Sequence, residues 1–254
     1  SDSQPTTEEP DDTSTPPSFV ATTLHVIIVA DTYDENIGIS VELDMENMTQ
    51  LLPAITGSTG LTLNAQDISG DLFTRNNVTN AIELLDVETD DIVIFYYSGH
   101  GVNLAKGSTW PAMAIKGGFL EVDWVIAQLK AKKPRFFLML VDACNTLLDI
   151  VPLQKRQYKE LPKPENYQQL FLNYRGNIVA SSSIPGQLSW GDAQKGGFFT
   201  QAFLNSLNEN LASSSEPNWY KLMERAGEPI YTSDPEQPTQ NPQYQINIEI
   251  IKEY

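Results

Sequence analysis

The sequence predicts an α/β domain with a mostly parallel sheet of about six strands and helices on both faces. Short apolar runs alternate along the chain with stretches of helical periodicity, and this alternation is typical of βαβ units. Several apolar runs are continuous, as in strands that are buried on both faces. The last run, residues 244–250, alternates strictly between polar and apolar residues and is typical of an edge strand.

The elements can be assigned in chain order. A first strand is expected at residues 24–30, followed by a helix whose apolar positions have helical spacing and which ends at Gly57. A second strand at 61–68 leads to a second helix, for which Asn76 and Asn77 are the cap candidates. The later elements are strands at 91–98, 110–115, 134–144 and 176–183, and helices at 120–130, 196–207 and 219–226.

Composition divides the chain into a tail and one domain. Residues 1–20 are mainly Ser, Thr, Pro and acidic residues, which predicts a disordered acidic tail or linker. Residues 21–254 form the domain, with a long irregular, mobile insertion at 145–176. No apolar run approaches the ~18 residues of a membrane span, so a soluble protein is expected. Such a tail suits an exported protein or a linker, and a cytoplasmic or exported location both remain open.

Charge excludes one class of partner. The chain has 33 acidic and 16 basic residues and a formal net charge of −17. Binding to nucleic acid needs clustered Lys and Arg, so nucleic acid is not expected as a partner. The histidines and the single cysteine have no zinc-ligand spacing, and no phosphate-binding glycine motif follows a strand.

Two apolar runs end at side chains that can carry chemistry. The run 91–98 leads through Gly99 to His100, and the run 136–143 leads directly to Cys144, the only cysteine. If the two strands are neighbours in a parallel sheet, both side chains meet at its carboxyl edge. An imidazole can take the proton of a thiol and create a nucleophilic thiolate. This pairing predicts a cysteine peptidase, whereas His25 begins the first strand and is expected at the opposite, amino edge.

Backbone donors are expected beside this pair. Glycines on both sides of His100 allow a substrate chain to approach closely. The amides of Gly101 and Cys144 are therefore candidates for the donors that stabilise an oxyanion.

The motifs around His100 and Cys144 resemble those of the caspase-like cysteine peptidases. Residues 97–101 (Tyr-Ser-Gly-His-Gly) and 141–144 (Val-Asp-Ala-Cys) are most similar to the metacaspase and bacterial orthocaspase branch. His100 precedes Cys144 by 44 residues (144 − 100), against roughly 50 in the caspase signature. The similarity continues through 180–190, 197–203 and 240–243, and it covers about residues 22–250.

The resemblance implies a fold, a reaction and a quaternary state. It implies the three-layer sandwich of the caspase–hemoglobinase class and an endopeptidase that works through a Cys–His dyad and an acyl-thioester. His100 is then the general base and acid, and Cys144 the nucleophile. No cofactor is required; some metacaspases need calcium, for which no site is assigned here, and the resemblance favours a monomer.

The same resemblance suggests a substrate pocket. In metacaspases an Asp two places before the nucleophile lines an acidic S1 pocket, and here that residue is Asp142. Asp44 is a second pocket candidate, and Ser182 belongs to the segment that resembles the cleft wall. The loop 31–40 holds no arginine that could receive an acidic side chain. We therefore expect peptide or protein substrates that are cut after Arg or Lys.

The insertion is the expected place of self-processing. It lies where the family usually separates its two subunits, and it holds a cluster of basic residues. These candidate cleavage positions are Lys155, Arg156, Lys159 and Lys163.

Other interpretations of these residues remain open. Taken alone, Cys144 could be a small buried apolar residue. Asp142 could accept a hydrogen bond from a backbone amide, and Asp44 could compensate the dipole of the helix in which it lies. Metacaspases usually have His-Ser-Gly after the cysteine, whereas residues 145–147 here are Asn-Thr-Leu. The alternatives are thus a catalytically inactive caspase-like interaction module, or a related cysteine peptidase outside this clan.

Overall fold

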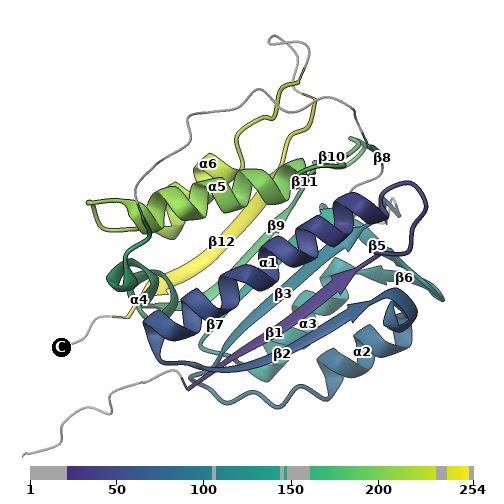
Figure 1. Cartoon of the computed structure of the whole chain (residues 1–254). Coiled ribbons are helices and arrows are strands. Elements are labelled where there is room, and N and C mark those ends of the chain that lie inside the picture. The colour runs from purple at the N-terminus through teal and green to yellow at the C-terminus, as the bar shows by residue number, and fades with distance from the viewer. Residues whose placement is uncertain (1–21, 105–106, 144–145, 148–160, 233–238, 252–254) are drawn as a thin grey trace, which may run out of the picture.

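A six-stranded sheet forms the centre of the protein (Figure 1). The computed structural model describes residues 22–104, 107–143, 146–147, 161–232 and 239–251. The strand order is β12-β9-β7-β3-β1-β2, with β12 antiparallel to β9 and all other neighbours parallel. The strands are β1 Thr23–Ala30, β2 Thr62–Ser69, β3 Ile92–Gly99, β7 Phe136–Ala143, β9 Tyr174–Ser181 and β12 Gln243–Ile250. The predicted fold class is confirmed.

Helices cover both faces of this sheet, and the sheet separates the apolar core into two clusters. On β3, Ile94 and Tyr96 belong to one apolar cluster, and Val93 and Phe95 belong to the other. This division explains why the central strands are apolar at consecutive positions. The first cluster is covered by α1 Gly38–Thr59, α4 Pro164–Leu172, α5 Phe198–Ala212 and α6 Trp219–Ala226, and the second by α2 Arg75–Glu83 and α3 Val122–Lys132.

Short elements complete the described chain beyond the main strands. The 3-10 turn η1 Gly70–Leu72 follows β2. One small sheet consists of β4 Gly101–Val102, β5 Ala112–Ile115 and β6 Gly118–Glu121, and the other of β8 Thr146–Leu147, β10 Trp190–Asp192 and β11 Gly196–Gly197. Because β4 directly follows His100, the first small sheet fixes the chain as it leaves the carboxyl edge of β3.

Two expected helix boundaries were wrong. Helix α1 continues through Gly57 and ends at Thr59, since Gly60 adopts the left-handed conformation (φ 76°) that closes a helix. Helix α2 is capped by Thr74, whose Oγ1 accepts a hydrogen bond from the amide of Asn77 at 3.2 Å. The side chain of the capping residue lies three positions before the amide that it caps, so the asparagines fall inside the helix.

The structure also differs from the irregular insertion expected at 145–176. Helix α4 and the start of β9 lie inside this range, and Leu170 and Phe171 are buried in the core. Pro164 occupies the first helical turn, where a proline without an amide proton is tolerated. The prolines of this segment therefore mark a helix start as well as a loop. Residues 148–160 and the predicted tail 1–20 lie outside the described residues.

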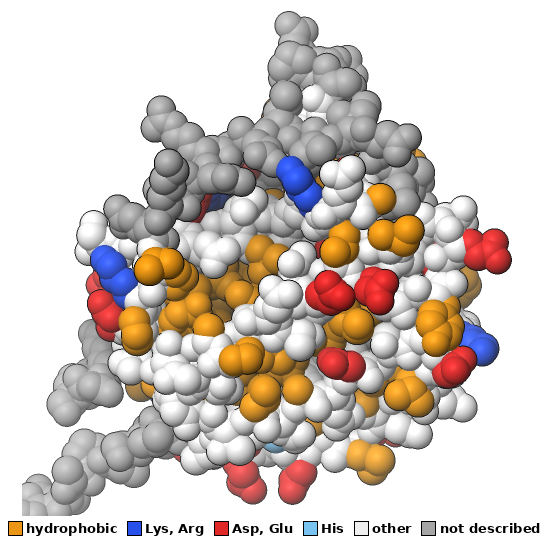
Figure 2. Space-filling model, viewed as in Figure 1, with side chains coloured by type: hydrophobic (Ala, Val, Ile, Leu, Met, Phe, Trp, Pro, Cys, Tyr) orange, Lys and Arg blue, Asp and Glu red, His pale blue; other side chains and the backbone are white. Residues whose placement is uncertain are grey.

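The surface agrees with the acidic composition. Figure 2 shows acidic side chains over the region of α1, where Glu42 and Glu46 are exposed. In the described part of the chain, no helix is long and apolar enough to cross a membrane.

Candidate active site

The predicted catalytic pair follows directly on the ends of β3 and β7. The two strands are parallel neighbours, and their last residues, Gly99 and Ala143, are register partners. His100 and Cys144 are the next residues of the two strands, and neighbouring strands lie about 4.8 Å apart. Cys144 itself lies outside the described residues. The sheet thus places the residues that precede the predicted dyad, Gly99 and Ala143, side by side.

Gly101, the first residue of β4, packs closely against the end of β7. A Cβ atom on Gly101 would lie 2.5 Å from the Cβ of Ala143, which is shorter than real side chains allow. The position therefore requires a glycine, because its backbone packs against the residue that precedes Cys144. Gly101 also pairs with Met113 of β5. The predicted oxyanion role of its amide is compatible with this place and stays a prediction.

His100 is half-buried and is held at two points. Its Nε2 lies 3.1 Å from Oδ2 of Asp34, and the exposed fractions of the two side chains are 31% and 21%. Its backbone carbonyl accepts a hydrogen bond from the Tyr97 hydroxyl at 2.6 Å and another from the Ala114 amide at 2.9 Å. The ring is fixed and yet open to solvent, as a group that exchanges protons with a substrate must be.

Two carboxylates of the loop after β1 face His100. Burial and the charge of Asp34 raise the pKa of Asp31, against the influence of His100. For Asp34, partial burial raises the pKa, but hydrogen bonds from the Ile37 and Asn36 amides and the neighbouring His100 outweigh it, so that the pKa is lowered. Asp34 therefore stays ionised beside the imidazole at neutral pH.

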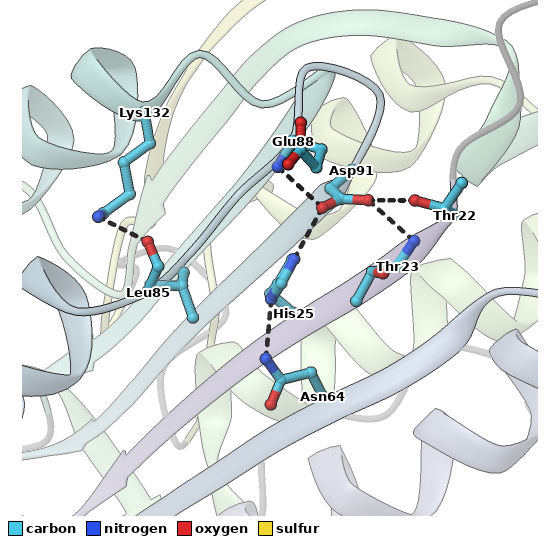
Figure 3. A network of polar contacts seen from close by, with 8 residues as sticks. All are labelled: Thr22, Thr23, His25, Asn64, Leu85, Glu88, Asp91 and Lys132. Atoms are coloured by element: carbon cyan, nitrogen blue, oxygen red, sulfur yellow. Dashed lines mark hydrogen bonds and ion pairs between the residues drawn. The ribbon is translucent and has the colours of Figure 1, made fainter.

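His25 lies at the opposite edge of the sheet, as predicted. Its Nε2 contacts Oδ2 of Asp91 at 3.0 Å, and Nδ1 contacts the Asn64 side chain at 3.1 Å (Figure 3). Asp91 also accepts hydrogen bonds from Thr22 and from the Thr23 and Glu88 amides. These hydrogen bonds join the amino ends of β1 and β3. Because both ring nitrogens of His25 have partners in this network, we assign His25 a structural role.

Asp44 and Asp142, the predicted pocket residues, come together below the carboxyl edge. Both are fully buried. Asp44 accepts hydrogen bonds from the Ser98 hydroxyl (2.7 Å) and the Gly197 amide (2.7 Å). Asp142 accepts from the amide and hydroxyl of Thr200 at 2.9 and 2.7 Å. A Cβ atom on Gly197 would collide with carboxylate oxygens of both residues, so the glycine backbone lies directly against the pair.

The surroundings of this pair disfavour two negative charges. Burial and then the charge of Asp142 raise the pKa of Asp44 well above its usual value, against hydrogen bonds from Ser98 and Gly197. Burial likewise raises the pKa of Asp142, against hydrogen bonds from Thr200. A proton, or a cation brought next to the carboxylates, would relieve this repulsion.

Ser182 joins strands within the sheet edge. Its side chain is fully buried, and its Oγ accepts a hydrogen bond from the Ala143 amide at 3.1 Å. Its own amide donates to the Val141 carbonyl, and its carbonyl accepts from the Gln240 side chain. Ser182 thus fixes the end of β7 just before Cys144. A direct contact with substrate stays a prediction.

A cleft opens beside the strand ends that lead to the dyad. Its lining includes Gly101, Trp110, Ala143 and the segment Ser183–Gln187. Ile184, one of the lining residues, is 42% exposed. A peptide lying along this segment would pass Ala143 and Gly101.

The predicted processing positions fall in two regions. Lys155, Arg156 and Lys159 lie outside the described residues. Lys163 is the residue before α4, where its amide donates to the Leu211 carbonyl at 2.9 Å and its Nζ to the Ser213 carbonyl at 3.1 Å. Within the described ranges, no group of three or more His, Cys, Asp and Glu side chains could hold a metal ion.

Sequence reasoning missed several residues of the site. It assigned no role to Asp34. Ser98, Thr200 and Gln240 lie in segments that resemble the family, but they too were given no role. Asp34 accepts hydrogen bonds from the amides of Asn36 and Ile37 in the turn that leads into α1, whereas α1 itself has no side-chain cap. Its contact with His100 spans 66 residues of chain, and no local pattern reports such a contact.

Comparisons with known proteins identify the family. The family model described as "Caspase domain" matches residues 26–249. The chain belongs to the caspase family. Its kind of function is that of a caspase-like cysteine peptidase, for which the substrates are peptides or proteins.

Solved structures show the same fold at low sequence identity. Caspase-1 from Spodoptera frugiperda is 13% identical, with a TM-score of 0.54 over 89% of this chain and 86% of that chain. A structural-genomics protein from Geobacter sulfurreducens is 17% identical, with a TM-score of 0.53 over 89% and 92% of the two chains. A search of curated protein sequences found no match.

Proposed function

We propose that this caspase-family protein is an endopeptidase of the metacaspase type in which His100 and Cys144 form the catalytic dyad. His100 takes the thiol proton, and the thiolate attacks the scissile carbonyl to give a tetrahedral oxyanion. The C–N bond then breaks, the leaving amine receives the proton from His100, and an acyl-thioester remains. Water, deprotonated by His100, hydrolyses the thioester and restores the thiol.

The observation that carries this proposal is the register of β3 and β7. Since Gly99 and Ala143 are partners, the next residue of each strand is one of the two proposed groups. The amides of Gly101 and Cys144 are the proposed oxyanion donors. Loss of one such donor typically costs about 2.7–4 kcal/mol of activation free energy.

The proposed cleavage after Arg or Lys is supported by the acidic pair. Asp44 and Asp142 converge on the backbone of Gly197, and both have a raised pKa because burial disfavours their charge. A guanidinium or ammonium next to them would offset that charge without a proton. Both carboxylates are fully buried in this structure, so binding of a basic side chain must displace hydrogen bonds such as that from Gly197.

Fluorogenic peptides that end in Arg, Lys or Asp test the reaction and the preference together. We expect cleavage after Arg and Lys by the wild type and none by Cys144→Ala. Preference for Asp would remove the proposed pocket but keep the peptidase. Absence of all cleavage, together with a thiol that is alkylated no faster than free cysteine, would favour the inactive interaction module.

Three further properties belong to the same proposal. The protein processes itself within the basic insertion, requires no metal or cofactor, and is a monomer. Lys163 is the least suitable processing position, because its backbone is held by hydrogen bonds at the start of α4, whereas a scissile bond must enter the active site as extended chain. Its neighbours in sequence, Lys155, Arg156 and Lys159, are the proposed positions.

A further inference from the structure

The carboxylate of Asp34 contacts one of the two ring nitrogens of His100, the proposed catalytic imidazole, and leaves the other nitrogen without this contact. Oδ2 of Asp34 lies 3.1 Å from Nε2 of His100. An ionised carboxylate only accepts hydrogen bonds, so this contact requires a proton on Nε2. In the neutral ring Nδ1 is then the acceptor, and it is the nitrogen that can take a proton from a thiol.

Asp34 is itself held in place by the start of α1. Its Oδ1 accepts hydrogen bonds from the amides of Asn36 (2.8 Å) and Ile37 (3.0 Å), and its carbonyl accepts one from Gly38 at 3.0 Å. One carboxylate oxygen is thus used for the turn and the other for His100. Such a side chain has little freedom to rotate, and this makes it a suitable anchor for the ring.

We propose that Asp34 is the positioning residue of the active site, which fixes His100 in the Nε2–H tautomer and leaves Nδ1 as the acceptor for the proton of the proposed nucleophile. This inference rests on the proposed function of the dyad. Asp34 does not touch the substrate; it acts through His100, as the buried aspartate does in the Ser-His-Asp triad. The lowered pKa of Asp34 supports an ionised anchor at neutral pH.

Three titratable groups of the described chain surround His100. Asp34 contacts the ring, Asp31 acts on it only through its charge, and the Tyr97 hydroxyl is bound to the His100 carbonyl. Asp31 also packs against Gly99, where an added Cβ would lie 3.2 Å from its Cβ. Replacement of Asp31 would therefore disturb packing, and Glu35, which is exposed in the same loop, is the better control for charge.

The decisive variant is Asp34→Asn. Asparagine keeps an oxygen for the amides of Asn36 and Ile37 but places an NH₂ donor against Nε2 of His100. The ring proton then moves to Nδ1, where it opposes proton transfer from the thiol. We expect kcat on an Arg substrate to fall about 10²-fold, within the usual range of general acid–base contributions, with KM changed less than about threefold.

A second variant controls for the loss of a negative charge from the same loop. Glu35→Gln removes the same charge and should leave kcat within about twofold of wild type.

Nitrogen NMR tests the tautomer without any substrate. The chain has only two histidines, so His25 serves as an internal reference in ¹⁵N-histidine-labelled protein. We expect Nε2–H for His100 in the wild type and Nδ1–H in Asp34→Asn, with unchanged His25 signals that show an intact fold. A wild-type ring protonated on Nδ1 would overturn the inference, and so would an unchanged tautomer in the variant.

The two proposals fail in distinguishable ways. If the wild type cleaves peptides and Asp34→Asn has the same kcat and the same His100 tautomer, the positioning role is wrong and the peptidase stands. If the wild type neither cleaves peptides nor shows enhanced alkylation of Cys144, its only cysteine, the proposed function fails and the positioning role falls with it.

Discussion

Addition of one methyl group to Gly101 would test whether the chain after His100 packs against Ala143, the last described residue before Cys144. In Gly101→Ala the new Cβ would lie 2.5 Å from the Cβ of Ala143, so the end of β7 or the start of β4 must move. Overpacking of this kind typically costs about 1–3 kcal/mol. At roughly 2–4 °C per kcal/mol for a chain of this size, the melting temperature should fall by about 2–12 °C.

The reciprocal change should relieve the clash. Without the Ala143 side chain, the next atoms around the new Cβ are the Ala112 carbonyl oxygen at 3.5 Å and the Ala143 Cα at 3.7 Å, which are ordinary contacts. Ala143→Gly alone should cost about 0.5–1 kcal/mol, as glycine does inside a strand. The double variant should therefore be more stable than the sum of the single effects, by at least about 1 kcal/mol.

Urea unfolding of the four proteins in the Cys144→Ala background measures this cycle without self-cleavage. Gly57→Ala is the matched control: Gly57 lies inside α1, a Cβ there would meet nothing within 4 Å, and alanine should stabilise the helix by up to about 1 kcal/mol. Additive effects of Gly101→Ala and Ala143→Gly would mean that the two residues do not touch, and the juxtaposition of His100 and Cys144 would lose its basis.

Two further predictions concern the acidic pair and the insertion. Because burial raises the pKa values of Asp44 and Asp142 in the folded protein, folding retains a proton that the unfolded chain loses above pH about 4. The free energy of unfolding should therefore fall as pH rises from there toward the raised values, by at most about 1.4 kcal/mol per pH unit for each proton. In Asp44→Asn the fall should be shallower in urea titrations from pH 4 to 8, and parallel curves for the two proteins would contradict the shared burial. For the insertion, mass spectrometry of the purified wild type should find new chain ends after Lys155, Arg156 or Lys159 that Cys144→Ala lacks, and Lys163→Gln should leave this pattern unchanged; a cut only after Lys163 would refute the argument from its hydrogen bonds.

The sequence predicted the parts of the fold that depend on local periodicity. Continuous apolar runs identified β1, β3 and β7, since a strand covered on both faces must be apolar at successive positions. Boundaries that depend on a single turn were less accurate: Gly57 was taken for the end of α1, although glycine is tolerated inside a helix that tertiary packing stabilises. Helix α4 was missed because its start is a proline within a basic, proline-rich segment.

For the site, the sequence by itself determined which residues end at the carboxyl edge, because strand direction and the parallel connections follow from the order of the elements. It therefore indicated His100 and Cys144 as partners and excluded His25. Only the tertiary structure decided what surrounds them. The contact of Asp34 with His100 and the burial of Asp44 against Asp142 join segments 66 and 98 residues apart (100 − 34 and 142 − 44). Such contacts are fixed by how the strands and helices pack, and no pattern within one segment records them.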